Sequence, residues 1–262
     1  MSDDGDSAVG RRQRRRSVLE NARDAGLDVA TIIDVGFATG TEGLYGVFDA
    51  YNFLVEPIAE MEPALRDFVQ SHPKTSYVLA AASDSDGVAE IVVRRSAGAS
   101  GFHATTKAGD SEQREVAKFK LDTLVRDHGL VGPFLIKIDV EGHELHVLKG
   151  AIATLAETAL IILEIHPWND DRKRGSATMM DLFRFMEDAG FAFYDLIEPF
   201  YRPLDGALFG FDGVWVKADG PLRRVRSFRS KEDGDLVRSQ RIEKNRALFD
   251  RKSPERPKTA AS

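Results

Sequence analysis

The sequence predicts a doubly wound, mostly parallel α/β sheet, and three observations support this fold class. Short apolar runs typical of buried strands alternate along the chain with segments whose apolar residues recur at helical spacing. Several of these runs are apolar throughout, as in strands that are covered on both faces. Most of them end on a glycine or an acid, where a parallel strand gives way to a loop that can meet a ligand.

The chain opens with a short amphipathic helix at Ser17–Gly26 and a β-branched strand at Thr31–Val35. The strand leads into a glycine loop, Asp34–Thr41, and an apolar stripe from Leu44 to Phe48 predicts a helix after it. Glycines at such a turn let the backbone approach a ligand, and the helix adds free amide groups. The spacing is D-x-G-x-x-x-G rather than the G-x-G-x-x-G of pyrophosphate sites, so an ordinary tight turn is an equal alternative.

The second strand, Tyr51–Val55, ends in Glu56 and Pro57 and is followed by a helix to about Ser71. An acid about 20 residues after a glycine loop, at the tip of the second strand, is placed to accept hydrogen bonds from both hydroxyls of a ribose. The loop and Glu56 together therefore favour an adenosine-containing cofactor.

The third strand, Ser76–Ala81, ends at a turn that contains Ser83 and Asp84. A polar side chain here can meet the adenine of the cofactor, although an ordinary Asp/Gly turn explains the residues equally well. Two alternating strands, Val88–Val93 and Glu115–Leu121, then form an inserted β-rich excursion. The Gly/Ser/Thr-rich segment between them is expected to be part of a lid or a substrate wall.

The next strand, Phe134–Ile138, stops at Asp139, and an apolar stripe from Leu145 to Ile152 predicts a helix beyond it. Ligands of open α/β sheets bind outside the carboxyl ends of the strands, so Asp139 is the first candidate for a functional side chain. The alternative is that Asp139 and Glu141 only cap the next helix, where acids are favourable whatever the function.

A second polar strand tip follows at Ala159–Ile165, a continuous buried-type strand that contains Glu164 and leads to His166. We expect this strand to be the neighbour of the preceding one, so that Asp139 and His166 converge from one rim. The remaining elements are a helix at Met179–Ala189 and strands at Phe191–Leu196 and Gly213–Lys217. This closing strand pair predicts an antiparallel strand at one edge of the sheet.

Composition excludes several classes of site. The 262 residues include no cysteine, which rules out disulfides, thiolate catalysis and iron–sulfur or zinc–thiolate sites. No uncharged run approaches the roughly 18 to 20 residues of a spanning helix, and the N-terminal stretch lacks the apolar core of a signal peptide. A cytoplasmic protein without a membrane span is therefore expected.

The charge pattern divides the chain into three parts. Residues 18–218 carry 18 basic and 32 acidic side chains, whereas both ends are basic. We therefore expect a disordered N-terminus at 1–16, one α/β domain at 17–218, and a basic tail at 219–262 that is partly helical or disordered. The tail interleaves acids with its arginines and has no aromatic stacking pattern, so nucleic acid is not an expected partner.

The acidic strand tips decide between cofactors. Asp34, Glu56, Asp84 and Asp139 repel a pyrophosphate but tolerate a sulfonium, which S-adenosylmethionine carries without any phosphate. S-adenosylmethionine is therefore favoured over a nicotinamide dinucleotide.

A family resemblance covers about Ser17 to Lys217. The stretches TIIDVGFATGTEGLY, FLVEP, AAASDSDG, KLDTL, FLIKIDVEGHELHVLKGA and LEIHP, in this order, resemble the FkbM-type S-adenosylmethionine-dependent methyltransferases. The resemblance implies a class I methyltransferase fold, which is a Rossmann-like sheet of seven strands. It also implies O-methylation of hydroxyls on sugars, glycans or other natural products.

The resemblance further implies that Gly36, Gly40, Glu56 and the Asp84 turn face the cofactor. One departure concerns the glycine loop, which in this family is commonly D-V-G-A-N-x-G. This chain has Phe37-Ala38 in the middle of the loop, so the contact of the family's Asn side chain is lost. The basic tail lies outside the resemblance.

Methyl transfer to a hydroxyl requires alignment of the reacting atoms and removal of the hydroxyl proton. His166 and His143 are candidate bases, and Asp139 and Glu141 can orient the acceptor. Asp139, Glu164 and His166 are also candidate ligands for Mg²⁺ or Mn²⁺. The residues expected at the cofactor are Asp34, Gly36, Phe37, Gly40, Thr41, Glu56, Pro57, Ser83, Asp84 and Asp139.

Two functions remain open at this point. The first is an S-adenosylmethionine-dependent O-methyltransferase with a small-molecule or glycan acceptor. The second is a non-catalytic methyltransferase-like module that binds the cofactor and recruits a partner through its basic tail. The presence of Glu56, Asp139, Glu141 and His166 at strand tips favours the enzyme, because a module without chemistry has no use for all of them.

Overall fold

The computed structural model describes residues 14–94, 100–101, 111–168 and 177–224, with residues 227, 235, 238–243 and 245–246 nearer the C-terminus. The chain divides into two units, Met1–Arg224 and Val225–Ser262. All the described strands lie in the first unit. Most of the Gly/Ser/Thr-rich segment that is expected to form a lid falls outside the described residues.

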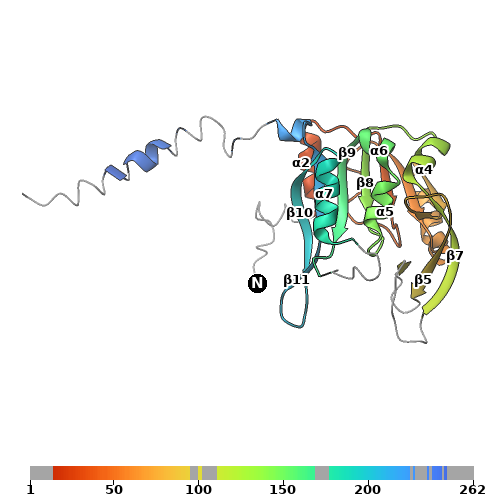
Figure 1. Ribbon diagram of the computed structural model, residues 1–262. Coiled ribbons are helices and arrows are strands. Elements are labelled where there is room, and N and C mark those ends of the chain that lie inside the picture. Colours follow the sequence, from red (N-terminus) through yellow and green to blue (C-terminus); the bar gives the residue numbers. More distant parts are fainter. Residues whose placement is uncertain are drawn as a thin grey trace, which may run out of the picture. The chain divides into compact units, whose positions relative to one another are not determined.

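The first unit is built on a seven-stranded sheet with the order β10-β11-β9-β8-β1-β2-β3 (Figure 1). The five strands from β9 to β3 pair in parallel, whereas β11 runs antiparallel to both β9 and β10. This confirms the doubly wound, mostly parallel α/β fold. The strands are β1 (Thr31–Val35), β2 (Tyr51–Glu56), β3 (Thr75–Leu79), β8 (Phe134–Ile138), β9 (Thr158–Ile165), β10 (Phe191–Tyr201) and β11 (Leu208–Lys217).

The expected edge position of the antiparallel strand is wrong. β11 lies one place in from the edge, between β9 and β10. Seven consecutive residues of β11 are buried, whereas only Phe191 and Ile197 of β10 are. The more apolar strand therefore takes the place that is covered on both sides, and the more polar strand forms the edge.

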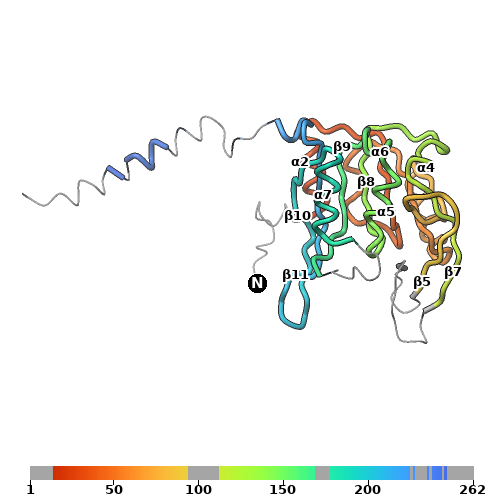
Figure 2. Tube along the Cα trace, viewed as in Figure 1, coloured from red at the N-terminus to blue at the C-terminus, as the bar shows by residue number. Residues whose placement is uncertain are grey.

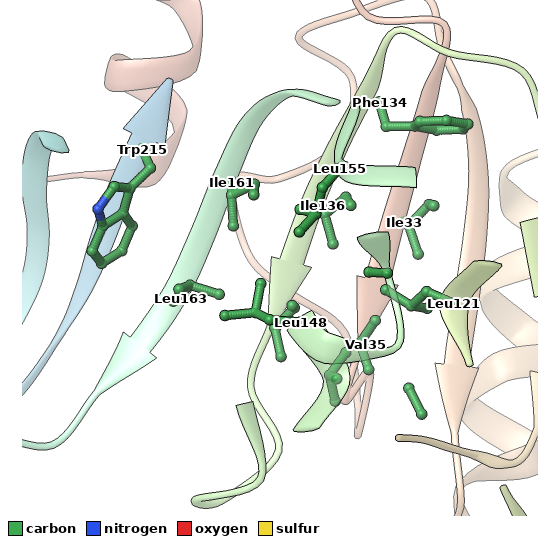
Figure 3. Close-up of a cluster of buried hydrophobic side chains, with 14 of the residues drawn as sticks. Ile33, Val35, Leu121, Phe134, Ile136, Leu148, Leu155, Ile161, Leu163 and Trp215 are labelled. Carbon is green, nitrogen blue, oxygen red and sulfur yellow. The ribbon is translucent and has the colours of Figure 1, made fainter. Parts of the chain in front are cut away.

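Helices cover both faces of this sheet. Helices α4 to α7 pack on one face, and their apolar residues join those of the strands in the largest core cluster (Figure 3). Helices α2 and α3 pack on the other face. The helices are α2 (Arg15–Asp24), α3 (Glu62–Ser71), α4 (Leu121–Asp127), α5 (Glu144–Lys149), α6 (Ile152–Ala156) and α7 (Met179–Asp188), with 3₁₀ turns at Ala59–Met61 and Pro221–Arg223. Within the described ranges, none of the helices combines the length and apolar character needed to span a bilayer.

A second sheet of four strands, in the order β4-β7-β5-β6, is inserted between β3 and α4. Figure 1 shows its β5 and β7 strands beside the β3 edge of the main sheet. This is the β-rich excursion that the alternating sequence pattern predicts. Its strands are β4 (Ala81–Ala82), β5 (Gly87–Arg94), β6 (Ser100–Gly101) and β7 (Ser111–Phe119).

The helix predicted after the glycine loop does not form, since residues 38–50 are turns and bends. Gly40, Gly43 and Gly46 adopt φ values of +113°, +75° and +76°, which lie far from the right-handed helix. Leu44 and Val47 are nevertheless buried, so the apolar pattern reports burial rather than a helix.

The helix predicted after Asp139 is divided into α5 and α6 by Gly150. A Cβ atom on Gly150 would lie 1.9 Å from the backbone oxygen of Ser83, so the turn after β4 packs directly on this glycine. Ile152, which follows the division, faces away from the core and is 59% exposed.

Candidate active site

The carboxyl ends of β1, β2 and β8 are drawn tightly together at Gly36. The amide of Gly36 donates to the Val55 oxygen at 2.9 Å, and the amide of Asp139 donates to the Val35 oxygen at 3.0 Å. Gly36 has φ +89°, and a Cβ atom there would lie 1.8 Å from the Asp139 oxygen. Only glycine adopts this φ without strain and also leaves room for the Asp139 oxygen. Gly36 therefore allows the end of β1 to approach Asp139 at the end of β8.

Asp34 lies beneath the glycine loop. Its side chain is fully buried, and its Oδ2 accepts hydrogen bonds from the Thr41 hydroxyl at 2.7 Å and from the Tyr45 hydroxyl. Burial and the charge of Asp34 both raise the pKa of Tyr45, so the phenol stays protonated and keeps donating. Asp34 and Thr41 therefore fix the loop from within.

Glu56 ends β2 and holds the loop from the other side. Its two carboxylate oxygens accept the backbone amides of Ala38 and Ile58, each at 2.9 Å. Burial raises the pKa of Glu56, and the two amide hydrogen bonds oppose that rise. Ala38 has φ +48°, a left-handed conformation that Asn tolerates better than Ala. Pro57 follows on the same rim and is half-buried.

Phe37 points into the core rather than to the rim. Its ring is 2% exposed and packs edge-on against Phe68, with the ring centroids 5.3 Å apart. Its backbone oxygen accepts the amide of Gly40 at 2.8 Å and so closes the loop. Contact with a cofactor is left to the backbone of Phe37.

The side chain of His143 lies against the Ser83 turn. Its Nε2 lies 3.0 Å from the Ser83 hydroxyl, and its ring stacks on His146 with centroids 4.2 Å apart. Asp84 follows Ser83; burial works to raise its pKa, but the Ser85 hydroxyl and nearby positive charge lower it. The structure thus joins His143 to the predicted adenine turn.

Asp139 is held by a lysine that sequence reasoning missed. The side chain of Lys137 is 4% exposed, and its Nζ donates to Asp139 Oδ2 at 2.7 Å. Burial opposes the charge of both groups, yet their attraction lowers the pKa of Asp139 and raises the pKa of Lys137. A lone lysine inside the apolar strand FLIKI was the available signal, since a buried lysine needs a carboxylate partner.

Glu164 and His166 come from the neighbouring strand β9. Burial and then the charge of Asp139 raise the pKa of Glu164 to about 10, so that Glu164 is protonated at neutral pH and hydrogen-bonds to Asp139. His166 Nδ1 lies 3.8 Å from Glu164 Oε2. Burial lowers the pKa of His166, although the charges of Asp139 and Asp212 oppose this. The imidazole is therefore neutral at pH 7.

Glu141 lies at the exposed outside of the turn after Asp139, with φ +54°. Its charge contributes to the raised pKa of Glu164, so it is part of the same electrostatic group. The turn itself is organised by Glu144, which accepts the amide of Gly142 at 2.9 Å and has a pKa that burial raises to about 7.

A buried arginine network adjoins this group. Arg15 of α2 donates to Asp212 and to Glu198, each at 2.6 Å. Asp212 lies on β11 directly opposite Glu164 in the strand register. These residues are distant in sequence, and only the acid within the apolar stretch FGFDGVWV indicated that β11 carries a charge at the site.

The predicted metal ligands do not form a metal site. The carboxylate of Asp139 is already paired with the Lys137 ammonium, 2.7 Å away. Among residues 14–94, 111–168 and 177–224, no group of three or more His, Asp or Glu side chains could hold a metal ion.

Comparison with known proteins adds to this geometry. Residues 49–193 match the family described as the methyltransferase FkbM domain. Over 157 residues the chain is 29% identical to hexuronic acid methyltransferase AglP of Haloferax volcanii; the match covers 60% of this chain and 63% of the relative. The chain thus spans less than two thirds of that relative's length.

Two solved structures are similar at low sequence identity. Methyltransferase FkbM from Methylobacillus flagellatus KT has 17% identity and a TM-score of 0.45, over 70% of this chain and 43% of that one. Magnesium protoporphyrin IX methyltransferase from Synechocystis PCC 6803, with bound S-adenosylmethionine, has 12% identity and a TM-score of 0.42, over 80% of each chain. The sheet of seven strands, in which β11 runs antiparallel to its neighbours, agrees with the class I fold that the family resemblance implies. The family match extends over more than half of the sequence, and the chain belongs to the FkbM methyltransferase domain family.

Proposed function

We propose that this methyltransferase transfers the methyl group of S-adenosylmethionine to a hydroxyl oxygen of a sugar, a glycan or a related natural product. The observation that carries the proposal is the group at the ends of β8 and β9. Asp139 lies there with its carboxylate 2.7 Å from the Lys137 ammonium, and at the neighbouring strand tip His166 Nδ1 lies 3.8 Å from Glu164 Oε2. Burial and the charge of Asp139 raise the pKa of Glu164, and burial lowers the pKa of His166. A carboxylate and an unprotonated imidazole are the groups that orient a hydroxyl and take its proton.

The residues around the first two strands fit S-adenosylmethionine. Glu56 is fixed by two backbone amides, and each of its oxygens keeps a lone pair that can accept a ribose hydroxyl. The Ser83 and Asp84 turn would meet the adenine, and the glycine loop would lie against the amino-acid part. When bound, the cofactor supplies an electrophilic methyl group on a positively charged sulfur, which the acidic rim tolerates.

Three residues of the chain have separate roles in the transfer. Lys137 keeps Asp139 ionised, and Asp139 accepts a hydrogen bond from the acceptor and so orients it. As the acceptor oxygen gains the methyl group, its proton passes to a ring nitrogen of His166. A neutral imidazole before the transfer is a condition for this step, and the burial of His166 favours that state.

The acceptor is proposed to be neutral at its reacting group. The rim gathers Asp139, Glu141 and Asp212 near His166, so an anionic acceptor group would meet repulsion there. A hydroxyl meets no such repulsion and can donate to Asp139. The hexuronic acid named for the relative in Haloferax volcanii supports a sugar as the class of acceptor.

Calorimetric titration with S-adenosylmethionine, followed by assay of S-adenosylhomocysteine formed with neutral and acidic glycosides, tests the proposal. We expect cofactor binding, and we expect Glu56→Gln to weaken it by more than about tenfold, because charge-assisted hydrogen bonds are lost. Binding without turnover on any glycoside would support the non-catalytic module instead. Absence of binding would refute both functions.

A further inference from the structure

Four exposed aromatic side chains lie on the chain segments around the proposed base, and two of them contact its ring. They come from the segment after β9 and from the hairpin that joins β10 to β11. Figure 2 shows this hairpin extending past the carboxyl ends of the parallel strands. We call the group the hairpin platform; its members are Trp168, Phe200, Tyr201 and Phe209, which are 55%, 40%, 58% and 39% exposed.

The hairpin platform is continuous with the catalytic group. The His166 ring meets Phe200 and Phe209 edge-on, and both centroid distances are 5.7 Å. Gly210 makes this packing possible, since a Cβ atom there would lie 2.4 Å from the Phe200 ring and 3.2 Å from His166 Cδ2. A molecule lying on the platform is therefore within reach of His166.

Trp168 makes two specific contacts although more than half of its surface is exposed. Its indole nitrogen donates to the Leu208 oxygen, and the Arg202 guanidinium lies 4.6 Å from its ring centroid. Arg202 is fixed in turn by Asp205, with 2.9 Å between Nε and Oδ1. A large aromatic side chain that is exposed and yet fixed in place is typical of a recognition surface.

The chemistry of the platform matches a sugar ring. A pyranose has a face of C–H groups, which an aromatic ring covers well, and an edge of hydroxyls, which needs polar partners. The platform supplies the rings, while Arg202, Asp205 and the rim carboxylates supply polar groups. We propose that the hairpin platform is the acceptor subsite, on which a sugar ring stacks and presents a hydroxyl to His166.

This inference rests on the proposed function for its link to methyl transfer, but sugar binding can be measured separately. The chain has two tryptophans, and the other one, Trp215, is 1% exposed. A sugar on the platform should therefore change the emission of Trp168 alone. The probes are methyl β-D-glucoside and methyl β-D-glucuronoside, titrated in the presence of S-adenosylhomocysteine.

We expect a saturable change in emission with at least one probe, and we expect Trp168→Phe to abolish the change while calorimetry still detects the sugar. Trp168→Ala and Tyr201→Ala should each weaken sugar binding by roughly threefold to tenfold, the usual worth of an aromatic contact. Tyr51→Ala is the matched control, because Tyr51 is also an exposed tyrosine but begins β2 at the opposite end of the sheet.

Failure of the subsite and failure of the function give different results. Methyl transfer whose acceptor KM is unchanged in Trp168→Ala and Tyr201→Ala would overturn the subsite and leave the function standing. Saturable sugar binding without any methyl transfer would leave the subsite standing and overturn the function. A second copy of the chain is the rival occupant; a dimer in sedimentation that Trp168→Ala dissociates, with no response to either sugar, would overturn the proposal.

Discussion

Charges at the ends of β8 and β9 are arranged so that two adjoining acids differ in protonation. Lys137 stabilises the negative charge of Asp139, and that charge in turn favours the protonated form of Glu164. Groups whose surroundings push their pKa values apart are characteristic of catalytic sites. At the scale of single residues, this separation is the feature that can be measured.

The raised pKa of Glu164 makes the stability of the protein depend on pH. The folded chain keeps this proton up to its raised pKa, whereas the unfolded chain loses it near the ordinary value of about 4.3. Between these values the folded state binds more protons, so the free energy of unfolding falls as pH rises. We predict that Glu164→Gln, which cannot ionise, gains stability relative to the parent between pH 5 and pH 8. Urea unfolding of both proteins at pH 5 and at pH 8 measures this gain. The prediction is contradicted if the variant and the parent differ in unfolding free energy by the same amount at both pH values.

Loss of either proposed catalytic group should affect turnover more than binding. We predict that His166→Ala and Asp139→Asn each lower turnover by roughly 10² to 10⁴, the usual worth of general acid–base help. Because burial lowers the pKa of His166, the parent should lose activity only below about pH 6.5. A rate in His166→Ala equal to that of the parent from pH 6 to 9 would assign the histidine a structural role. Activity that EDTA removes and magnesium restores would reopen the question of a metal.

At the scale of elements, the central strands could be predicted and the edges could not. The limits of β1 and β8 match the expected ones because most of their residues are apolar, all of them are buried, and each strand ends sharply at a glycine or an acid. β10 and β11 are longer than expected, because Pro199 and Gly210 interrupt the strand pattern in their outer halves, where the pairing of the two strands continues with register shifts. The helix expected after the glycine loop failed because three glycines there adopt positive φ, which apolar spacing does not reveal.

The close approach of β1 and β8 at Gly36 gives a direct test. Gly36 and Gly26 share φ +89°, but a Cβ atom on Gly26 has nothing within 4 Å. Gly26→Ala should therefore lower the free energy of unfolding only by the conformational penalty of about 1 to 2 kcal/mol. Gly36→Ala should lower it by that amount and by about 1 to 3 kcal/mol more, because its Cβ atom clashes with Asp139. Gly36→Ala should also abolish cofactor binding. Equal losses of unfolding free energy in the two variants would show that the strand tips can separate without harm.

At the scale of the whole molecule, the site draws on segments from across the first unit. The sequence placed Asp139, Glu164 and His166 on adjoining strand tips, because the carboxyl ends of parallel strands share a rim. It did not reveal Arg15 as the partner of Asp212, since these residues are 197 positions apart and nothing local connects them. Long-range polar partners of this kind follow from the tertiary fold and not from local pattern.

The division of the chain predicts how truncation acts. All the core clusters of the described residues lie before Arg224, and Leu222 packs against one of them. Removal of Val225–Ser262 should change the melting temperature by less than about 2 °C and leave cofactor affinity unchanged. Removal from Pro221 onward should lower it further, because Leu222 is lost. A large fall in melting temperature after removal of Val225–Ser262 alone would contradict this division of the chain.

The central claim is that the rim at β8 and β9 methylates a sugar hydroxyl. Mass spectrometry of glycosides incubated with the enzyme and methyl-labelled S-adenosylmethionine tests it most directly. We expect a labelled methyl group that survives mild alkali, as an ether on a hydroxyl does, and that is absent with His166→Ala. A label that mild alkali removes would mark an ester on a carboxylate, and no labelled sugar from an enzyme that binds the cofactor would contradict the account altogether.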